Sequence, residues 1–290
     1  MQLSITNLNK TYANGVHALK DVNLTINQGM FGLLGPNGAG KSSLMRTIAT
    51  LQEPDSGSIT LGNINVLTQK EEIRKTLGYL PQEFGVYPKV DATTLLNHLA
   101  VLKGITNSSE RKAVVEALLQ KTNLWDARKK NLGGYSGGMK QRFGIAQALL
   151  ANPTLIIVDE PTAGLDPAER NRFLNLLSEL GENTVVILST HIVDDVKELC
   201  SDMAIFNKGE ILFKGSPDEA LTSIVDKIWQ KRINKAELSE YKQNFKVISE
   251  KLIGGNPLIH VLADSNPDGT FEAIEGDLED VYFSKIFANA

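Results

Sequence analysis

Residues 35–42 read G-P-N-G-A-G-K-S, which satisfies the pattern G-x-x-x-x-G-K-[ST] in full. The glycines allow a tight backbone turn that points several N–H groups at one anion. The apolar run 30–34 before this loop predicts a buried strand, and residues 42–49 after it predict a helix whose positive end faces the same anion. A strand, a loop and a helix in this order predict a phosphate-binding loop rather than a chance glycine-rich turn.

The phosphate-binding loop predicts most of the nucleotide contacts. A mobile cation at Lys41 suits the outer phosphates of a nucleotide, and the hydroxyl of Ser42 suits Mg²⁺. The binding residues predicted from the loop are Gly35, Pro36, Asn37, Gly38, Ala39, Gly40, Lys41, Ser42 and Ser43.

Composition excludes several other classes of protein. The single cysteine, Cys200, excludes an internal disulfide and a cysteine-rich metal site. The net charge of −4 and the absence of a basic patch argue against a nucleic-acid partner. Uncharged stretches are broken by Gly, Asn, Gln and Pro, so we expect no membrane-spanning helix, and residues 1–6 do not resemble a secretion signal.

Hydrophobic patterns divide the chain into a large α/β part, 1–215, and a small α+β appendage, 216–290. Short strands are predicted at 2–7, 22–26, 58–61 and 77–80, buried parallel strands at 155–158 and 184–188, and a hairpin at 203–213. Helices at 91–102 and 109–120 predict a helical insert over about 85–150. In the appendage, strands are predicted at 227–233, 245–253 and 258–263, and a helix at 277–287. A capping box at 216–219 marks the border.

Two acidic residues follow the apolar run 155–158. In open parallel sheets, ligands bind beyond the carboxyl ends of the strands, so Asp159 and Glu160 are expected to face the phosphates. Asp159 fits a Mg²⁺-organising role, and Glu160 fits a group that orients or deprotonates an attacking water.

A second anion site is predicted at Ser136, Gly137 and Gly138. These residues stand just before the helical pattern 141–150, and N–H groups at a helix start bind anions. Two such helix starts in one chain mean either two bound phosphates or one nucleotide shared between two copies.

The motifs named above, with Gln82, residues 135–139, 164–166 and His191, occur in the order seen in ATP-binding cassette (ABC) ATPases, the motor subunits of ABC transporters. The resemblance covers about residues 1–215. It implies a P-loop NTPase core with an antiparallel β subdomain and a helical insert. It also implies ATP hydrolysis with Mg²⁺, by two copies that hold ATP head to tail between Lys41 of one chain and Ser136 of the other.

The resemblance implies further roles for single residues. Tyr12 resembles the aromatic residue that stacks on adenine, and Asp166 the residue that communicates across the dimer. Gln82 resembles the loop glutamine at the Mg²⁺ site, and His191 the switch histidine that contacts the γ-phosphate. The implied catalytic residues are Glu160, His191 and Gln82, and the implied metal ligands are Ser42, Gln82 and Asp159.

The signature motif departs from the usual family pattern, because it begins with Tyr135 and ends with Met139 instead of Leu and Gln. Such variants resemble the exporter branch that handles drugs, lipids and polysaccharides. The resemblance implies a homodimer or a paired ATPase subunit. It also implies a permease that docks on the helical insert and holds the chain at the inner face of the cell membrane, on the cytoplasmic side. The alternatives are a non-transport ABC ATPase acting as a scaffold or regulator, and a different phosphate-loop enzyme such as a small-molecule kinase.

Overall fold

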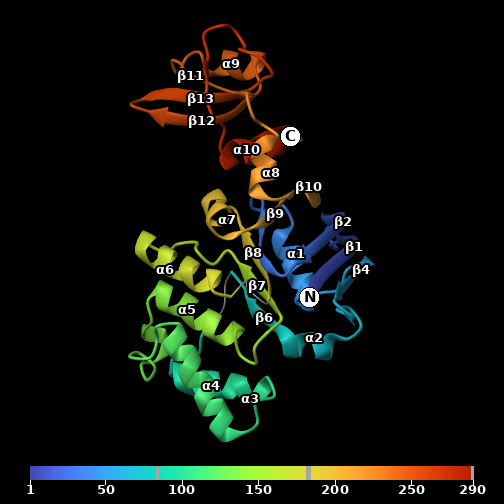
Figure 1. Ribbon diagram of the computed structural model, residues 1–290, viewed down its shortest axis with the longest axis vertical. Coiled ribbons are helices and arrows are strands. Elements are labelled where there is room, and N and C mark those ends of the chain that lie inside the picture. The colour runs from blue at the N-terminus through green and yellow to red at the C-terminus, as the bar shows by residue number, and fades with distance from the viewer. Residues whose placement is uncertain (83–84, 181–183, 289–290) are drawn as a thin grey trace.

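The computed structural model describes residues 1–82, 85–180 and 184–288, so Glu83, the last residue of the predicted Gln82 motif, lies outside the described residues. A six-stranded sheet in the order β10-β9-β3-β8-β7-β6 forms the centre of the molecule (Figure 1). All neighbouring pairs are parallel except β9 with β10. The strands are β3 (Gly29–Leu34), β6 (Leu77–Leu80), β7 (Leu155–Asp159), β8 (Val185–Thr190), β9 (Asp202–Asn207) and β10 (Glu210–Gly215). Every residue of β7 and β8 is buried, which explains their unbroken apolar runs.

An antiparallel sheet in the order β2-β1-β4-β5 packs against the central sheet and α1 (Lys41–Ile48) through one shared apolar core. Its strands are β1 (Gln2–Thr11), β2 (His17–Asn27), β4 (Ser56–Leu61) and β5 (Ile64–Asn65). Both long strands exceed the predicted segments 2–7 and 22–26. The β1–β2 pairing shifts register between Ile5 and Thr11, and such irregularities hide the alternation of apolar residues on which the prediction depends.

The predicted helical insert lies between β6 and β7 and comprises α3 (Ala92–Leu102), α4 (Ser108–Lys121) and α5 (Gly137–Ala148). Asp91 caps α3 by accepting a hydrogen bond from the Thr94 N–H at 3.0 Å, as the sequence predicts. Asn107 caps α4 in the same way. The three helices enclose an apolar cluster of their own. Helix α5 lies beside the central sheet, and α3 and α4 lie farther from it (Figure 1).

Three further helices of the large part were not predicted: α2 (Lys70–Thr76), α6 (Pro167–Ser178) and α7 (Val193–Leu199). Two of them have only seven residues each, which is too short for an apolar periodicity to emerge. Helix α7 packs closely over β3, because a Cβ atom at Gly32 would lie 2.7 Å from the Val196 side chain.

The C-terminal part begins with α8 (Pro217–Thr222), whose start has the capping box predicted from Ser216 and Glu219. A sheet in the order β12-β13-β11-β14 follows, built from β11 (Ile228–Arg232), β12 (Val247–Ile253), β13 (Asn256–Leu262) and β14 (Glu272–Ala273). The helix α9 (Leu238–Asn244), which was not predicted, covers one face of this sheet, and α10 (Leu278–Ala288) ends the chain. The α/β P-loop fold with an antiparallel β subdomain, a helical insert and a small α+β appendage is therefore confirmed (Figure 1).

No helix within the described residues is long and apolar enough to cross a membrane.

Candidate active site

The phosphate-binding loop connects β3 to α1 in a conformation that only glycine fits at several positions. Gly38 and Gly40 have φ angles of 81° and 110°. A Cβ atom at Gly40 would lie 2.3 Å from the carbonyl oxygen of Ala18, and one at Gly35 would lie 2.2 Å from that of Phe206. Gly40 is the N-cap residue of α1, so it offers no side chain to the first N–H groups of that helix. The loop therefore leaves backbone N–H groups available at the start of α1, the end of a helix at which anions bind.

A cleft of about 630 Å³ opens over this loop. Its walls include the predicted residues Tyr12, Gln82 and Glu160 together with residues 36–43. Further lining residues that were not predicted are Val16, His17, Ala18, Lys20, Lys208 and Gly209. They come from β2 and the residue before it, and from the turn between β9 and β10, where the N–H of Gly209 donates to the carbonyl of Ala39 at 2.8 Å. The turn itself was recognised in the sequence, but its contact with the loop depends on tertiary structure.

Glu160 brings three other predicted residues together at one carboxylate. Its Oε1 lies 3.5 Å from Nζ of Lys41. Its Oε2 lies 3.2 Å from Nδ1 of His191 and accepts a hydrogen bond from Nε2 of Gln82 at 3.3 Å. The side chains of Glu160 and Lys41 are only 7% and 5% exposed, whereas His191 is 43% exposed, so the network reaches from the interior to the surface. Lys41, Gln82, Glu160 and His191 therefore form one cluster, although they are up to 150 residues apart.

Lys41 is held inside the loop that it serves. Its Nζ donates to the carbonyl oxygens of Gly35 at 2.6 Å and Pro36 at 3.2 Å. Burial lowers the pKa of Lys41, whereas the carboxylates of Glu160 and Asp159 oppose that shift. An incoming phosphate would add negative charge beside this ammonium group, which favours its charged form.

Asp159 is buried at the end of β7, and its Oδ1 has no hydrogen-bond partner among the described residues. Burial raises the pKa of the Asp159 carboxyl, and the hydroxyls of Ser189 and Ser42 with the charge of Lys41 oppose that shift. A buried carboxylate oxygen without a partner is suited to a cation. The described residues contain no group of three His, Cys, Asp or Glu side chains able to hold a metal, so Mg²⁺ here would also need phosphate oxygens.

The residues Ser136, Gly137 and Gly138 lie outside the cleft. Ser136 caps α5 and accepts a hydrogen bond from the Met139 N–H at 3.2 Å. The helix begins at Gly137 and not after Gly138 as predicted, because the Ser136 cap already satisfies the first turn. Tyr135, the departure from the usual signature, is 5% exposed and donates its hydroxyl to the carbonyl of Ala127 at 3.0 Å.

Two other predicted residues make intrachain contacts. The hydroxyl of Tyr12 lies 2.9 Å from Oγ of Ser43 and donates to Gln52 at 3.0 Å, which holds the tyrosine at the cleft wall. Asp166 caps α6 by accepting from the Glu169 N–H at 2.9 Å, and like Ser136 it lies outside the cleft.

A family model described as "ABC transporter" matches residues 19–163, which is half of the chain. The chain belongs to the ABC transporter ATP-binding proteins. It is 39% identical to the uncharacterised ABC transporter ATP-binding protein YxlF of Bacillus subtilis (strain 168), over 75% of this chain and 72% of that protein. It is 30% identical to the daunorubicin/doxorubicin resistance ATP-binding protein DrrA of Streptomyces peucetius, over 91% and 78%. It is 33% identical to the methionine import protein MetN of Photobacterium profundum, over 89% and 78%.

Solved ABC structures share the fold of this ABC ATPase. The dimeric post-hydrolysis structure of the cassette MJ0796 with ADP and phosphate superposes with a TM-score of 0.67 at 28% identity, over 74% of this chain and 98% of that one. The solved structure of another ATP-binding subunit of an ABC transporter gives a TM-score of 0.69, over 77% of this chain and 93% of that one. The chain is therefore an ATP-binding and ATP-hydrolysing subunit of an ABC transporter.

Proposed function

We propose that this ABC ATPase powers export through a separate membrane permease, and that two copies close head to tail around ATP. The observation that carries this proposal is the separation of two predicted half-sites in one chain. Lys41 and Glu160 both line the cleft, whereas Ser136 and the start of α5 lie outside it. A second copy would supply the missing signature residues, and the ATP phosphates would then be attracted to positive helix ends on both sides.

In the proposed reaction, Glu160 accepts a proton from a water molecule whose oxygen attacks the γ-phosphorus. The bond from that phosphorus to the β–γ bridging oxygen breaks, which leaves ADP and inorganic phosphate. Lys41 and the loop N–H groups stabilise the phosphate charge, and His191 moves from Glu160 toward the γ-phosphate. Ser42, Gln82 and Asp159 would hold Mg²⁺, which neutralises phosphate charge when it is bound.

The permease would dock in a groove between the core and the helical insert. This groove of about 370 Å³ is lined by residues of α3, α5 and β6. Its rim bears Leu51 and Leu102, which are 62% and 72% exposed. Exposed leucines beside a groove favour a protein partner. A permease helix bound there would shift when the insert moves relative to the core. This arrangement would place the chain at the cytoplasmic face of a membrane.

Export as the direction of transport is supported by the drug-resistance relatives and by the Tyr135 signature. The methionine import relatives favour import as the second candidate. A scaffold or regulator role without transport is the other alternative. Co-purification with a multi-span membrane protein, followed by the direction of ATP-driven substrate movement in vesicles, decides among the three.

The variant Glu160→Gln tests the dimerisation step. Because the amide cannot accept the proton from water, ATP should stay bound and hold the dimer closed. We expect a dimer on size-exclusion chromatography with ATP and a monomer with ADP. The same variant carrying Ser136→Arg should remain monomeric with ATP, because the arginine would block the signature half-site. A Glu160→Gln chain that binds ATP and stays monomeric would contradict the proposal.

A further inference from the structure

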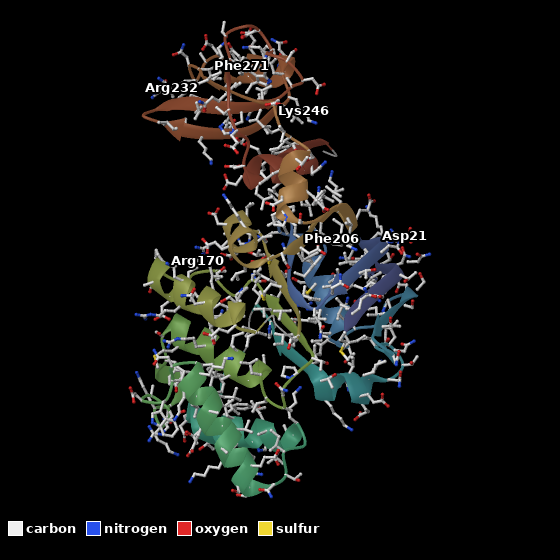
Figure 2. All side chains as sticks on the ribbon, in the orientation of Figure 1. Asp21, Arg170, Phe206, Arg232, Lys246 and Phe271 are labelled. Carbon is white, nitrogen blue, oxygen red and sulfur yellow. The ribbon has the colours of Figure 1, made fainter. Side chains whose placement is uncertain are left out.

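Asp195 on α7 is a fully buried carboxylate with two partners from a different part of the chain. Its exposed fraction is 0%. Its Oδ2 accepts a hydrogen bond from the hydroxyl of Thr162 at 2.5 Å. Its Oδ1 accepts one from Nε of Arg170 at 2.8 Å and lies 2.6 Å from the neighbouring guanidinium nitrogen Nη2. Arg170 lies on α6 where that helix faces α7 (Figure 2).

The two partners of Asp195 both lie shortly after predicted site residues in the sequence. Thr162 follows Glu160 by two residues, and Arg170 follows Asp166 by four. Asp195 itself follows His191 by four residues, and α7 begins at Val193. One carboxylate therefore holds both ends of the segment 162–170, which directly follows Glu160, against the helix that follows His191.

The backbone of Glu160 needs such a restraint. Its φ angle is 48°, in the left-handed region that a glutamate rarely adopts. Residues in that region persist where surrounding contacts over-determine them, and they cluster at functional sites. The N–H of Glu160 donates to the carbonyl of Ser189 at 2.8 Å, which holds one side of the residue. The Thr162–Asp195 hydrogen bond holds the chain on the other side.

We propose that Asp195 is a positioning residue for hydrolysis, which acts through Thr162 to hold the Glu160 carboxylate in its reactive place. The inference rests on the proposed role of Glu160. Arg170 balances the buried charge and lies 3.8 Å from Glu198 as well, so the guanidinium group joins α6 to α7 at two points. Asp195 touches neither the cleft nor the phosphate-binding loop, so its effect is on the placement of Glu160 and not on ATP binding.

The most direct test is Thr162→Val, which removes the hydroxyl and keeps the shape of the side chain. Misplacement of a catalytic group by a fraction of an ångström lowers turnover, so we expect kcat to fall by about tenfold or more with the KM for ATP unchanged. Thr162→Ser restores a hydroxyl and should recover most of kcat. Thr122→Val is the matched control, because Thr122 is also buried and its hydroxyl donates to the Leu118 carbonyl within the helical insert, outside the cleft. It should lower the melting temperature without changing kcat.

Equal kcat values for Thr162→Val, Thr122→Val and the wild type would overturn the inference. The inference would also be overturned if Thr162→Val changed only the KM for ATP, or if its fall in kcat were no larger than the fall in the fraction of folded protein. Arg170→Lys keeps the positive charge but loses the paired contacts of Nε and Nη2 with Asp195. If Thr162→Val does not fold, the same kcat and KM measurements are made on Arg170→Lys. Glu160→Gln is assayed beside them: full turnover in that variant would refute the proposed function itself, whereas an inactive Glu160→Gln beside a normal Thr162→Val refutes only the role of Asp195.

Discussion

Glu160 combines a left-handed backbone, a buried carboxylate and contacts to Lys41, Gln82 and His191. The sequence predicts its presence at the end of a buried strand, because the strand and both acidic residues are local features. The convergence of the four residues is not local. The motif resemblance implied it, and the central sheet produces it by bringing the carboxyl ends of β3, β6, β7 and β8 to one edge.

Asp159 offers a prediction in which stability and function oppose each other. Its pKa is raised by burial, so the folded state binds a proton more tightly than the unfolded chain does. Its negative charge therefore subtracts stability as pH rises through the unfolded and then the folded pKa, and the loss is complete above the folded pKa. Asp159→Asn removes that charge. We expect a higher melting temperature at pH 7 without ligand, and a loss of the extra stabilisation that Mg²⁺ adds to ATP.

Thermal melts with ATP in Mg²⁺ or in EDTA measure both effects. Asp264→Asn is the control, because the Asp264 side chain is 91% exposed and its substitution should leave both quantities unchanged. A lower melting temperature for Asp159→Asn at pH 7 together with a normal Mg²⁺ effect would refute the role of Asp159 as a Mg²⁺ ligand.

At the scale of elements, α5 and α6 are in close contact at their first turns. A Cβ atom at Gly138 would lie 2.5 Å from Oε2 of Glu169. Glu169 is itself held by Arg142 at 3.4 Å and Arg172 at 2.9 Å. Gly138 is therefore needed for the close packing of two helices, in addition to its proposed role in the approach of an anion. Sequence reasoning identified only the anion role, since α6 was not predicted.

Gly138→Ala should keep the fold and ATP binding in the cleft, because the colliding atom is the end of a flexible side chain. The displaced Glu169 carboxylate and the added methyl group would disturb the start of α5, so we expect turnover to fall by about tenfold. ATPase rates at saturating ATP measure this. Adding Glu169→Ala removes the colliding atom and should recover part of the rate, and a wild-type rate for Gly138→Ala alone would contradict the packing argument.

The same scale shows which elements a sequence pattern predicts well. Helices α3 and α4 were predicted within one residue of each end, because both carry side-chain caps and regular apolar spacing. Helix α7 was missed because its seven residues are too few to show an apolar period, and three of them are acidic. Yet α7 holds Asp195 and follows His191, so the missed helix is important to the site.

At the scale of the molecule, the appendage is joined to the core by packing as well as by sequence. Leu278, Val281 and Tyr282 of α10 are buried in the same apolar cluster as Met203 and Ile205 of β9. The rest of the appendage has a small core of its own around Ile259 and Phe271. The domain border at residues 215 and 216 stays a prediction, since the end of the chain returns to pack on the core (Figure 1).

The pairing of two chains is the central claim, and complementation between two inactive variants tests it most directly. Lys41→Ala disables the phosphate-loop half-site, and Ser136→Arg disables the signature half-site. In a mixed head-to-tail dimer, Lys41 of one chain and Ser136 of the other still complete one site. Equal mixing makes about half of the dimers mixed, so we expect ATPase activity of about a quarter of the wild-type rate from two preparations that are each inactive. A mixture as inactive as its components, or a Ser136→Arg chain with full activity alone, would contradict the account.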